Sequence, residues 1–91
     1  MFKPDVIAYS ARGACAVHAG RDYRNDGAGS DISSAPLEGA DEGECCRRCQ
    51  ASPGGACRHF TVDMAADMCY LKSRQGVVKE GSGQLVSGDL L

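Results

Sequence analysis

The sequence predicts an α+β domain in which an antiparallel sheet of short strands surrounds one helix. Three observations support this fold class: short strand-like runs along the chain, a single helix start signal, and six cysteines in only 91 residues. A domain of this length buries only about 60–65% of the surface of its unfolded chain, and the sequence contains no tryptophan to enlarge the core. We therefore expect disulfides to stabilise the fold, since each contributes roughly 2–4 kcal/mol.

Short apolar runs bounded by turn residues mark the strands. The predicted strands cover residues 6–9, 15–19, 57–62, 68–71, 77–78 and 85–87. Residues 63–67 join the third and fourth of these runs and predict a hairpin loop. Residues 21–31 contain Asn25-Asp26-Gly27, which favours turns, so this stretch is predicted to be turn-rich.

One helix is predicted over residues 42–51. Asp41 and Glu44 have the spacing of a capping box, and the Pro-Gly-Gly run after Ser52 ends the helix. The segment contains no Leu, Ile, Val or Phe, so its apolar stripe consists of Cys45 and Cys49, which lie four positions apart. A helix this short and this polar is marginal in water, and we expect covalent bonds to hold it to the sheet.

Composition excludes several classes of protein. The formal net charge is −2 with both signs interspersed, which gives no basic surface for nucleic acid. The apolar runs are too short to insert into a membrane. No signal peptide follows Met1, because Phe2-Lys3-Pro4-Asp5 turns polar at once. If the cysteines are oxidised, we expect the chain to be a mature or excised piece of an extracellular (secreted or cell-surface) protein.

The cysteine block carries a resemblance. Its motifs are Cys45-x-x-x-Cys49, a Pro53-Gly54 turn, Cys57-x-x-Phe60-Thr61 and Cys69-Tyr70-Leu71-Lys72-Ser73. This pattern resembles the PAN/Apple domain, in particular the modules of apicomplexan microneme adhesins. The resemblance covers residues 15–91 and leaves residues 1–14 as an N-terminal arm. It implies a five-stranded antiparallel sheet cradling one α-helix, with the helix bridged to the central strands by disulfides.

The resemblance also implies two disulfide pairs, Cys45–Cys69 and Cys49–Cys57. Cys15 and Cys46 are then left over. Cys46 lies about 100° around the helix from Cys45 and is expected to reach the strand that carries Cys15, which would give a third pair, Cys15–Cys46. The alternative is that these two cysteines are free or form bonds between chains.

Other readings of the same residues remain open. Cys46-x-x-Cys49 is a zinc half-site that Cys57 and His59 would complete, but no second Cys-x-x-Cys follows. Residues 26–32 resemble one copy of a glycine-aspartate calcium loop, and a turn is the simpler interpretation. His18 and His59 have no nucleophile partner in the sequence, and both are interpreted as strand residues. We expect no metal, no cofactor and no enzymatic activity.

The first functional hypothesis is an adhesion module. PAN/Apple domains bind proteins and carbohydrates, which implies a protein or glycan partner on a cell surface or matrix. A sugar site needs an aromatic surface with convergent polar groups. The candidates are Tyr23 for the ring, with Arg21, His59 and Lys72 as polar contacts.

The second hypothesis is a structural subunit. Val6-Ile7-Ala8-Tyr9 is an apolar run outside the PAN/Apple-like region. It either folds back on its own sheet edge or pairs with the edge of another copy. Head-to-tail pairing of that kind builds a homo-polymer, an extracellular filament or coat. The sequence has no Asn-x-Ser/Thr sequon, but its eight serines leave O-glycosylation of such a filament open.

Overall fold

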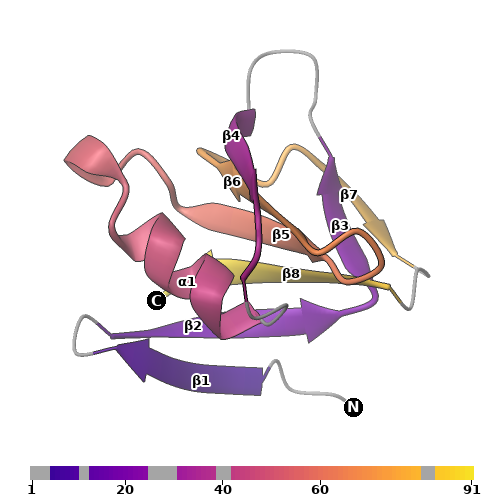
Figure 1. Ribbon diagram of the computed structural model, residues 1–91, viewed down its shortest axis with the longest axis horizontal. Coiled ribbons are helices and arrows are strands. Elements are labelled where there is room, and N and C mark those ends of the chain that lie inside the picture. Colours follow the sequence, from indigo (N-terminus) through magenta and orange to yellow (C-terminus); the bar gives the residue numbers. More distant parts are fainter. Residues whose placement is uncertain (1–4, 11–12, 25–30, 39–41, 81–83) are drawn as a thin grey trace.

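The structure is a computed structural model that describes residues 5–10, 13–24, 31–38, 42–80 and 84–91. Its elements are β1 (Asp5–Ser10), β2 (Gly13–Ala19), β3 (Arg21–Arg24), β4 (Asp31–Pro36), α1 (Glu42–Gln50), the 3-10 turn Pro53–Gly55, β5 (His59–Asp63), β6 (Met68–Lys72), β7 (Val77–Glu80) and β8 (Leu85–Leu90). Six strands form the main antiparallel sheet in the order β1-β2-β8-β5-β6-β4, and β3 pairs with β7 in a small second sheet (Figure 1).

The predicted fold class is confirmed, with one strand added. Five strands, β2, β8, β5, β6 and β4, form the antiparallel sheet that carries α1. β1 extends this sheet to six strands by pairing antiparallel with β2 of the same chain. The helix ends at Gln50, within one residue of the prediction.

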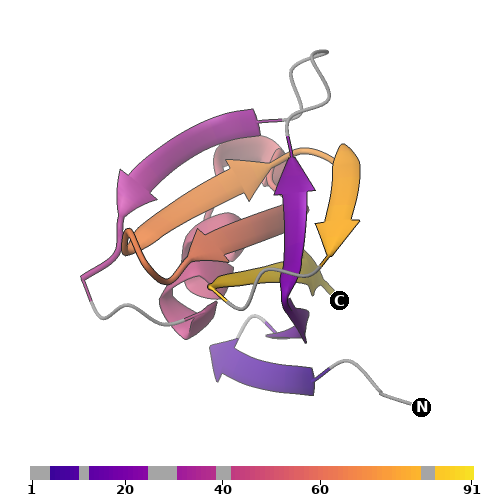
Figure 2. The ribbon, with the colours of Figure 1, turned by 90° about the vertical axis from the view of Figure 1, so that its right-hand side faces the viewer.

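The sheet has a different cover on each face. α1 packs across one face and contacts β5, β8 and β6. The small sheet lies over the other face, where β3 contacts β8 and β5 (Figures 1 and 2). The molecule therefore has three layers: a helix, the main sheet and the two-stranded sheet.

The first half of the stretch predicted to be turn-rich is a strand. β3 pairs with β7 from Arg21 opposite Glu80 to Arg24 opposite Val77. The strand follows Gly20, whose positive φ of 78° supplies the bend and whose N–H donates to the Leu85 carbonyl at 2.7 Å. The turn residues responsible for the prediction, 25–30, lie outside the described residues, as does the predicted cap Asp41.

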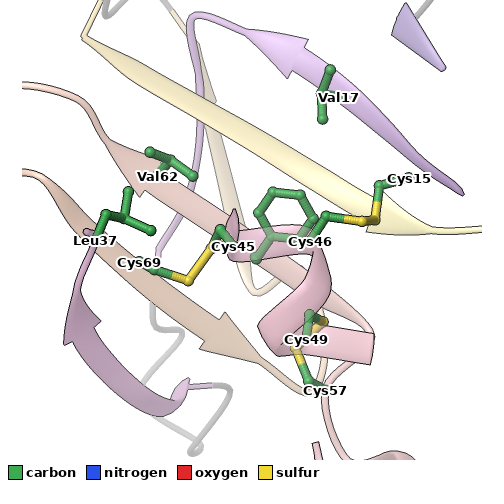
Figure 3. Close-up of a cluster of buried hydrophobic side chains, with 10 residues drawn as sticks. Cys15, Val17, Leu37, Cys45, Cys46, Cys49, Cys57, Val62 and Cys69 are labelled. Atoms are coloured by element: carbon green, nitrogen blue, oxygen red, sulfur yellow. A yellow bond between two sulfur atoms is a disulfide. The ribbon is translucent and has the colours of Figure 1, made fainter. Parts of the chain in front are cut away.

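The core on the helix face is built largely from sulfur (Figure 3). Three disulfides join Cys15 to Cys46, Cys45 to Cys69 and Cys49 to Cys57, the same pairs that were expected from the sequence. All six cysteines are at most 1% exposed. The buried side of α1 therefore includes Cys46, which the predicted stripe of Cys45 and Cys49 had left out.

Few hydrocarbon side chains complete this core. Phe60 and Val62 from β5 are fully buried, and Leu37 closes the side beside Cys45 and Cys69. Gly88 lies directly under the Phe60 ring. A Cβ atom at position 88 would be only 2.1 Å from the ring Cζ, so no larger residue fits there without a shift. The tight fit between ring and strand explains why β8 has a glycine in its interior.

The disulfides bear on the zinc reading. The sulfur atoms of Cys46, Cys49 and Cys57 are each bonded to another sulfur. Zinc binds cysteine as a thiolate, so these three residues supply no zinc ligand in this form of the protein.

Candidate ligand-binding pocket

Strand alternation places polar side chains on the sheet face away from α1. In β6, the disulfide of Cys69 fixes that residue on the helix face, so Tyr70 and Lys72 face the other way. In β5, Phe60 and Val62 belong to the core. Thr61 between them therefore faces the small sheet, and its hydroxyl accepts the backbone N–H of Tyr23 at 3.1 Å.

A pocket of about 270 Å³ lies between this polar face and β3. Its lining comes from β3, β4, β5, β6 and β8 and comprises Asp22, Tyr23, Arg24, Asp31, Thr61, Asp63, Tyr70, Lys72 and Leu85. Segments far apart in the sequence thus meet at one hollow. Its volume suits a single sugar ring or one amino-acid side chain better than a large ligand.

Four of the five charged groups that the described residues contribute to the pocket lining are paired with one another. Lys72 is only 3% exposed, and its ammonium group forms an ion pair with Asp31. The same ammonium nitrogen lies 6.0 Å from the ring centroid of Tyr70. Arg24 Nε donates to Asp22 Oδ2 at 2.9 Å. The pocket therefore offers ordered donors and acceptors beside an aromatic ring.

Asp89 on β8 forms a hydrogen-bonding centre beside the pocket. Its Oδ1 accepts from His59 Nδ1 at 2.7 Å, from the Tyr23 hydroxyl at 2.9 Å and from Gln75 Nε2 at 3.1 Å. Its Oδ2 lies 3.2 Å from His18 Nε2. One carboxylate thus ties together β2, β3, β5 and the connection before β7, and it holds the fully buried Tyr23 in place.

A second polar contact holds β3 against the main sheet. The Thr61 and Ser87 hydroxyls lie 2.8 Å apart, and the Ser87 hydroxyl donates to the Arg21 carbonyl at 2.7 Å. Thr61 and Ser87 are at most 1% exposed, yet both are satisfied. These bonds position the β3 wall of the pocket.

Burial and hydrogen bonding shift two pKa values here. Burial, and then the hydrogen bond to Asp89, raise the pKa of Tyr23 to about 12. Burial by itself would raise the pKa of Asp89, but its hydrogen-bond donors, of which His59 has the largest effect, outweigh burial and lower it. The tyrosine is therefore neutral and the aspartate ionised at physiological pH.

The residues expected to bind a ligand fall in three places. Tyr23 and Lys72 line the pocket. His59 belongs to the hydrogen-bonding centre at Asp89, with its ring edge-on to Tyr23. Arg21 pairs with Glu80 across the small sheet at 3.0 Å. The four residues are neighbours, but only two of them face the same hollow.

The structure adds pocket residues that the sequence analysis had not named, notably Asp31, Asp63 and Tyr70. Tyr70 lies inside a motif of the resemblance and follows Cys69 directly. Side chains alternate between the two faces of a strand, so Tyr70 and Lys72, one and three positions after Cys69, are expected together on the face opposite the helix. Asp31 and Asp63 reach the pocket through strand order, which no local pattern reveals.

The expected self-association segment lies at the sheet edge. Val6, Ile7 and Ala8 of β1 are opposite Ala16, Cys15 and Ala14 of β2, and an irregularity separates Ala8 from Ser10, around Tyr9. In this structure the segment pairs within its own chain. β2 begins at Gly13, within the last two residues of the predicted arm, 1–14.

Two other features are absent from the described residues. No group of three or more His, Cys, Asp or Glu within them is arranged to hold a metal ion. None of the helices among the described residues has the length and apolarity needed to cross a membrane.

Comparison with known proteins agrees with the fold. A comparison with curated proteins finds no matching sequence. A family model, described as the PAN domain, matches residues 13–89. The matched range runs from the first residue of β2 to Asp89 on β8, and so contains α1, all six cysteines and both walls of the pocket. With the sheet, the helix and most of the sequence in agreement, the chain belongs to the PAN domain family.

Proposed function

We propose that this chain is a non-catalytic adhesion module that binds carbohydrate on a cell surface or matrix through the pocket between β3 and the main sheet. PAN domains are protein- and carbohydrate-binding modules of extracellular proteins. Three disulfides in a chain this small are typical of the same oxidising environment. Both properties support binding outside the cell as the role of this chain.

The observation that carries the proposal is the chemistry of the pocket. Lys72 supplies a donor, Asp31 and Asp63 supply acceptors, and Tyr70 supplies an aromatic ring. Ligand sites combine apolar surface with a few fixed polar groups that orient the ligand. Hydroxyl groups of a sugar both donate and accept hydrogen bonds, so they match this mixture.

Tyr70 provides the test. Its side chain is half-buried and forms neither a disulfide nor part of the core, so Tyr70→Ala is expected to leave the fold intact. We expect the variant to lose roughly tenfold or more in glycan affinity, because a stacked aromatic contact contributes about 1–1.5 kcal/mol beyond its area. Glycan arrays identify the ligand and titration calorimetry measures the affinity.

Arg58→Ala is the matched control. Arg58 is exposed, precedes β5 and is not among the pocket residues. Its loss should leave binding unchanged. If the Tyr70→Ala variant bound the glycan as tightly as the wild-type chain, the ligand site would have to lie elsewhere on the molecule.

Self-assembly is a second candidate function, favoured by one observation. β1 lies outside the matched residues 13–89, yet it supplies the edge strand of the sheet. We propose that β1 can also pair with β2 of a neighbouring copy, which would exchange a contact already present within the chain. Repeated exchange would build a homo-polymer, and O-glycans on its serines would make it a glycosylated filament.

A deletion tests this candidate. Removal of residues 1–12 leaves β2 whole, since β2 begins at Gly13. The full chain should form polymers at high concentration, and the shortened chain should stay monomeric in size-exclusion chromatography and negative-stain images. Two monomeric proteins would rule out assembly through this segment.

A further inference from the structure

We infer that the pocket discriminates by charge, taking neutral or amino-substituted sugars and disfavouring acidic sugars such as uronic acids. This inference rests on the pocket being the ligand site proposed above. Membership of the PAN domain family implies binding of proteins or carbohydrates in general, and it does not define which sugars would bind. The charged groups that line the pocket indicate which class of sugar it would bind.

The lining carries an excess of negative charge. Three carboxylates, from Asp22, Asp31 and Asp63, face two cations, from Arg24 and Lys72. At neutral pH the formal charge of the lining, counted over the residues that the structure describes, is therefore −1. Both cations already have a carboxylate partner inside the pocket, Asp22 for Arg24 and Asp31 for Lys72.

Among the described residues that line the pocket, an acidic ligand finds no cation without a carboxylate partner. To reach Lys72 it must replace Asp31, and the lysine is 3% exposed, so the exchange would have to take place in a partly desolvated site. The displaced aspartate would then face the incoming anion. Like charges about 4–6 Å apart at a partly exposed site repel by an amount equivalent to roughly fivefold to tenfold in affinity.

A neutral sugar meets no such barrier. The carboxylate of Asp31 is 39% exposed, so it is open to solvent while it holds Lys72. A sugar hydroxyl can donate to such a carboxylate, and hydrogen bonds to ionised groups are stronger than neutral ones. An ammonium group on an amino sugar adds attraction to the net negative lining, an attraction that salt weakens.

The experiment compares sugars that share one ring stereochemistry and carry different charges. The full chain is titrated with glucose, glucosamine and glucuronic acid, and with the three galacto counterparts, and NMR shifts of Tyr70 and Lys72 report occupancy. We expect glucuronic or galacturonic acid to bind at least fivefold more weakly than the matching neutral sugar. The amino sugar should bind at least as well as the neutral one at low salt.

Charge-removing variants sharpen the test. Asp63→Asn and Asp22→Asn should each narrow the gap between the neutral and the acidic sugar. Asp67→Asn is the matched control, because Asp67 is exposed on the β5–β6 turn at φ 53°, a conformation that asparagine adopts readily. It should leave the gap unchanged. Two different pocket variants guard against one of them failing to fold.

The outcomes separate the two proposals. Acidic sugars that bind as tightly as neutral ones, or a gap that neither pocket variant alters, would overturn the charge selectivity while leaving the pocket as the binding site. If no sugar shifts Tyr70 or Lys72, both the selectivity and the carbohydrate function of the pocket are overturned.

Discussion

The two faces of the main sheet are stabilised by different chemistry. On the helix face, disulfides and a few apolar side chains hold α1 against the strands. On the opposite face, hydrogen bonds centred on Asp89 and on Thr61 hold β3. The comparison shows how a chain with few large apolar side chains can still position a polar site: covalent bonds stabilise one face, which leaves the other free to carry the polar groups of the proposed ligand site.

The largest expected effect comes from the helix face. Three double variants each replace one disulfide with alanines: Cys15/Cys46, Cys45/Cys69 and Cys49/Cys57. The loops that these bonds close differ in sequence separation, at 31, 24 and 8 residues. The chain-entropy model predicts losses in unfolding free energy of about 3.5 kcal/mol for the two long loops and about 2.5 kcal/mol for the short one.

Denaturant titration of the three variants measures these losses. Loss of the Cys49–Cys57 disulfide should lower the stability of the whole fold without changing the pocket itself. We therefore expect the Cys49/Cys57 variant to keep glycan binding under native conditions. If the short-loop variant proved the least stable of the three, the differences in unfolding free energy would have to come from packing around the sulfur atoms and not from loop length.

A smaller loss is expected from steric crowding on the same face. In Gly88→Ala the new Cβ would meet the buried Phe60 ring at 2.1 Å, and we expect a loss of about 1–3 kcal/mol in unfolding free energy. Phe60→Leu removes the ring atoms that clash. The double variant should therefore be more stable than the sum of the two single losses predicts, and strict additivity would argue against the contact.

The polar face should be sensitive to acid through Asp89. Its folded-state pKa lies below its ordinary value, so its contribution to stability is present above the unfolded pKa of about 3.9 and is lost as the pH falls through the lower folded value. Thermal unfolding between pH 5 and pH 2 should show this loss. Asp89→Asn should flatten that part of the curve, whereas an unchanged curve would assign the acid sensitivity to other carboxylates.

The smallest effect is expected from Tyr23→Phe. The change removes the hydroxyl that donates to the ionised Asp89 at 2.9 Å, which costs about 1.5 kcal/mol, because hydrogen bonds to charged groups are stronger than those between neutral groups. The pKa of Tyr23 is raised from about 10 to about 12, so its contribution is present below pH 10 and is lost as the pH rises toward 12. The variant should lack this alkaline loss in stability curves recorded between pH 9 and pH 12.

Sequence alone predicted the helix face far better than the polar face. Cys45, Cys49 and Cys57 fall within one short block, and the resemblance of its motifs to the PAN/Apple domain implied the five-stranded sheet and two of the bridges of α1. The helix limits followed from a polar segment ended by a Pro-Gly turn. These signals are local in the sequence, so they can be interpreted without knowing the order of the strands in the sheet.

The polar face depends on contacts that are distant in sequence. His18 and Asp89 are 71 residues apart, and Tyr23 and Asp89 are 66 apart. Asp89 had no distinguishing pattern near the end of the chain, and it became visible only when β8 was placed between β2 and β5. β3 was missed for the same reason, since its only strand partner in the described residues, β7, lies more than 50 positions later.

The adjacent pair Cys45 and Cys46 has a mechanical consequence. Their bridges run to Cys69 and to Cys15, on strands at opposite sides of the sheet. If the two ends of the chain are pulled apart, the tension passes from Cys15 to Cys46, across one peptide bond to Cys45, and leaves through Cys69. Residues 16–44 and 47–68 lie off this load path and cannot be drawn out. Under such tension the chain would therefore extend only before Cys15 and after Cys69, while the pocket residues between these two cysteines stay behind covalent bonds.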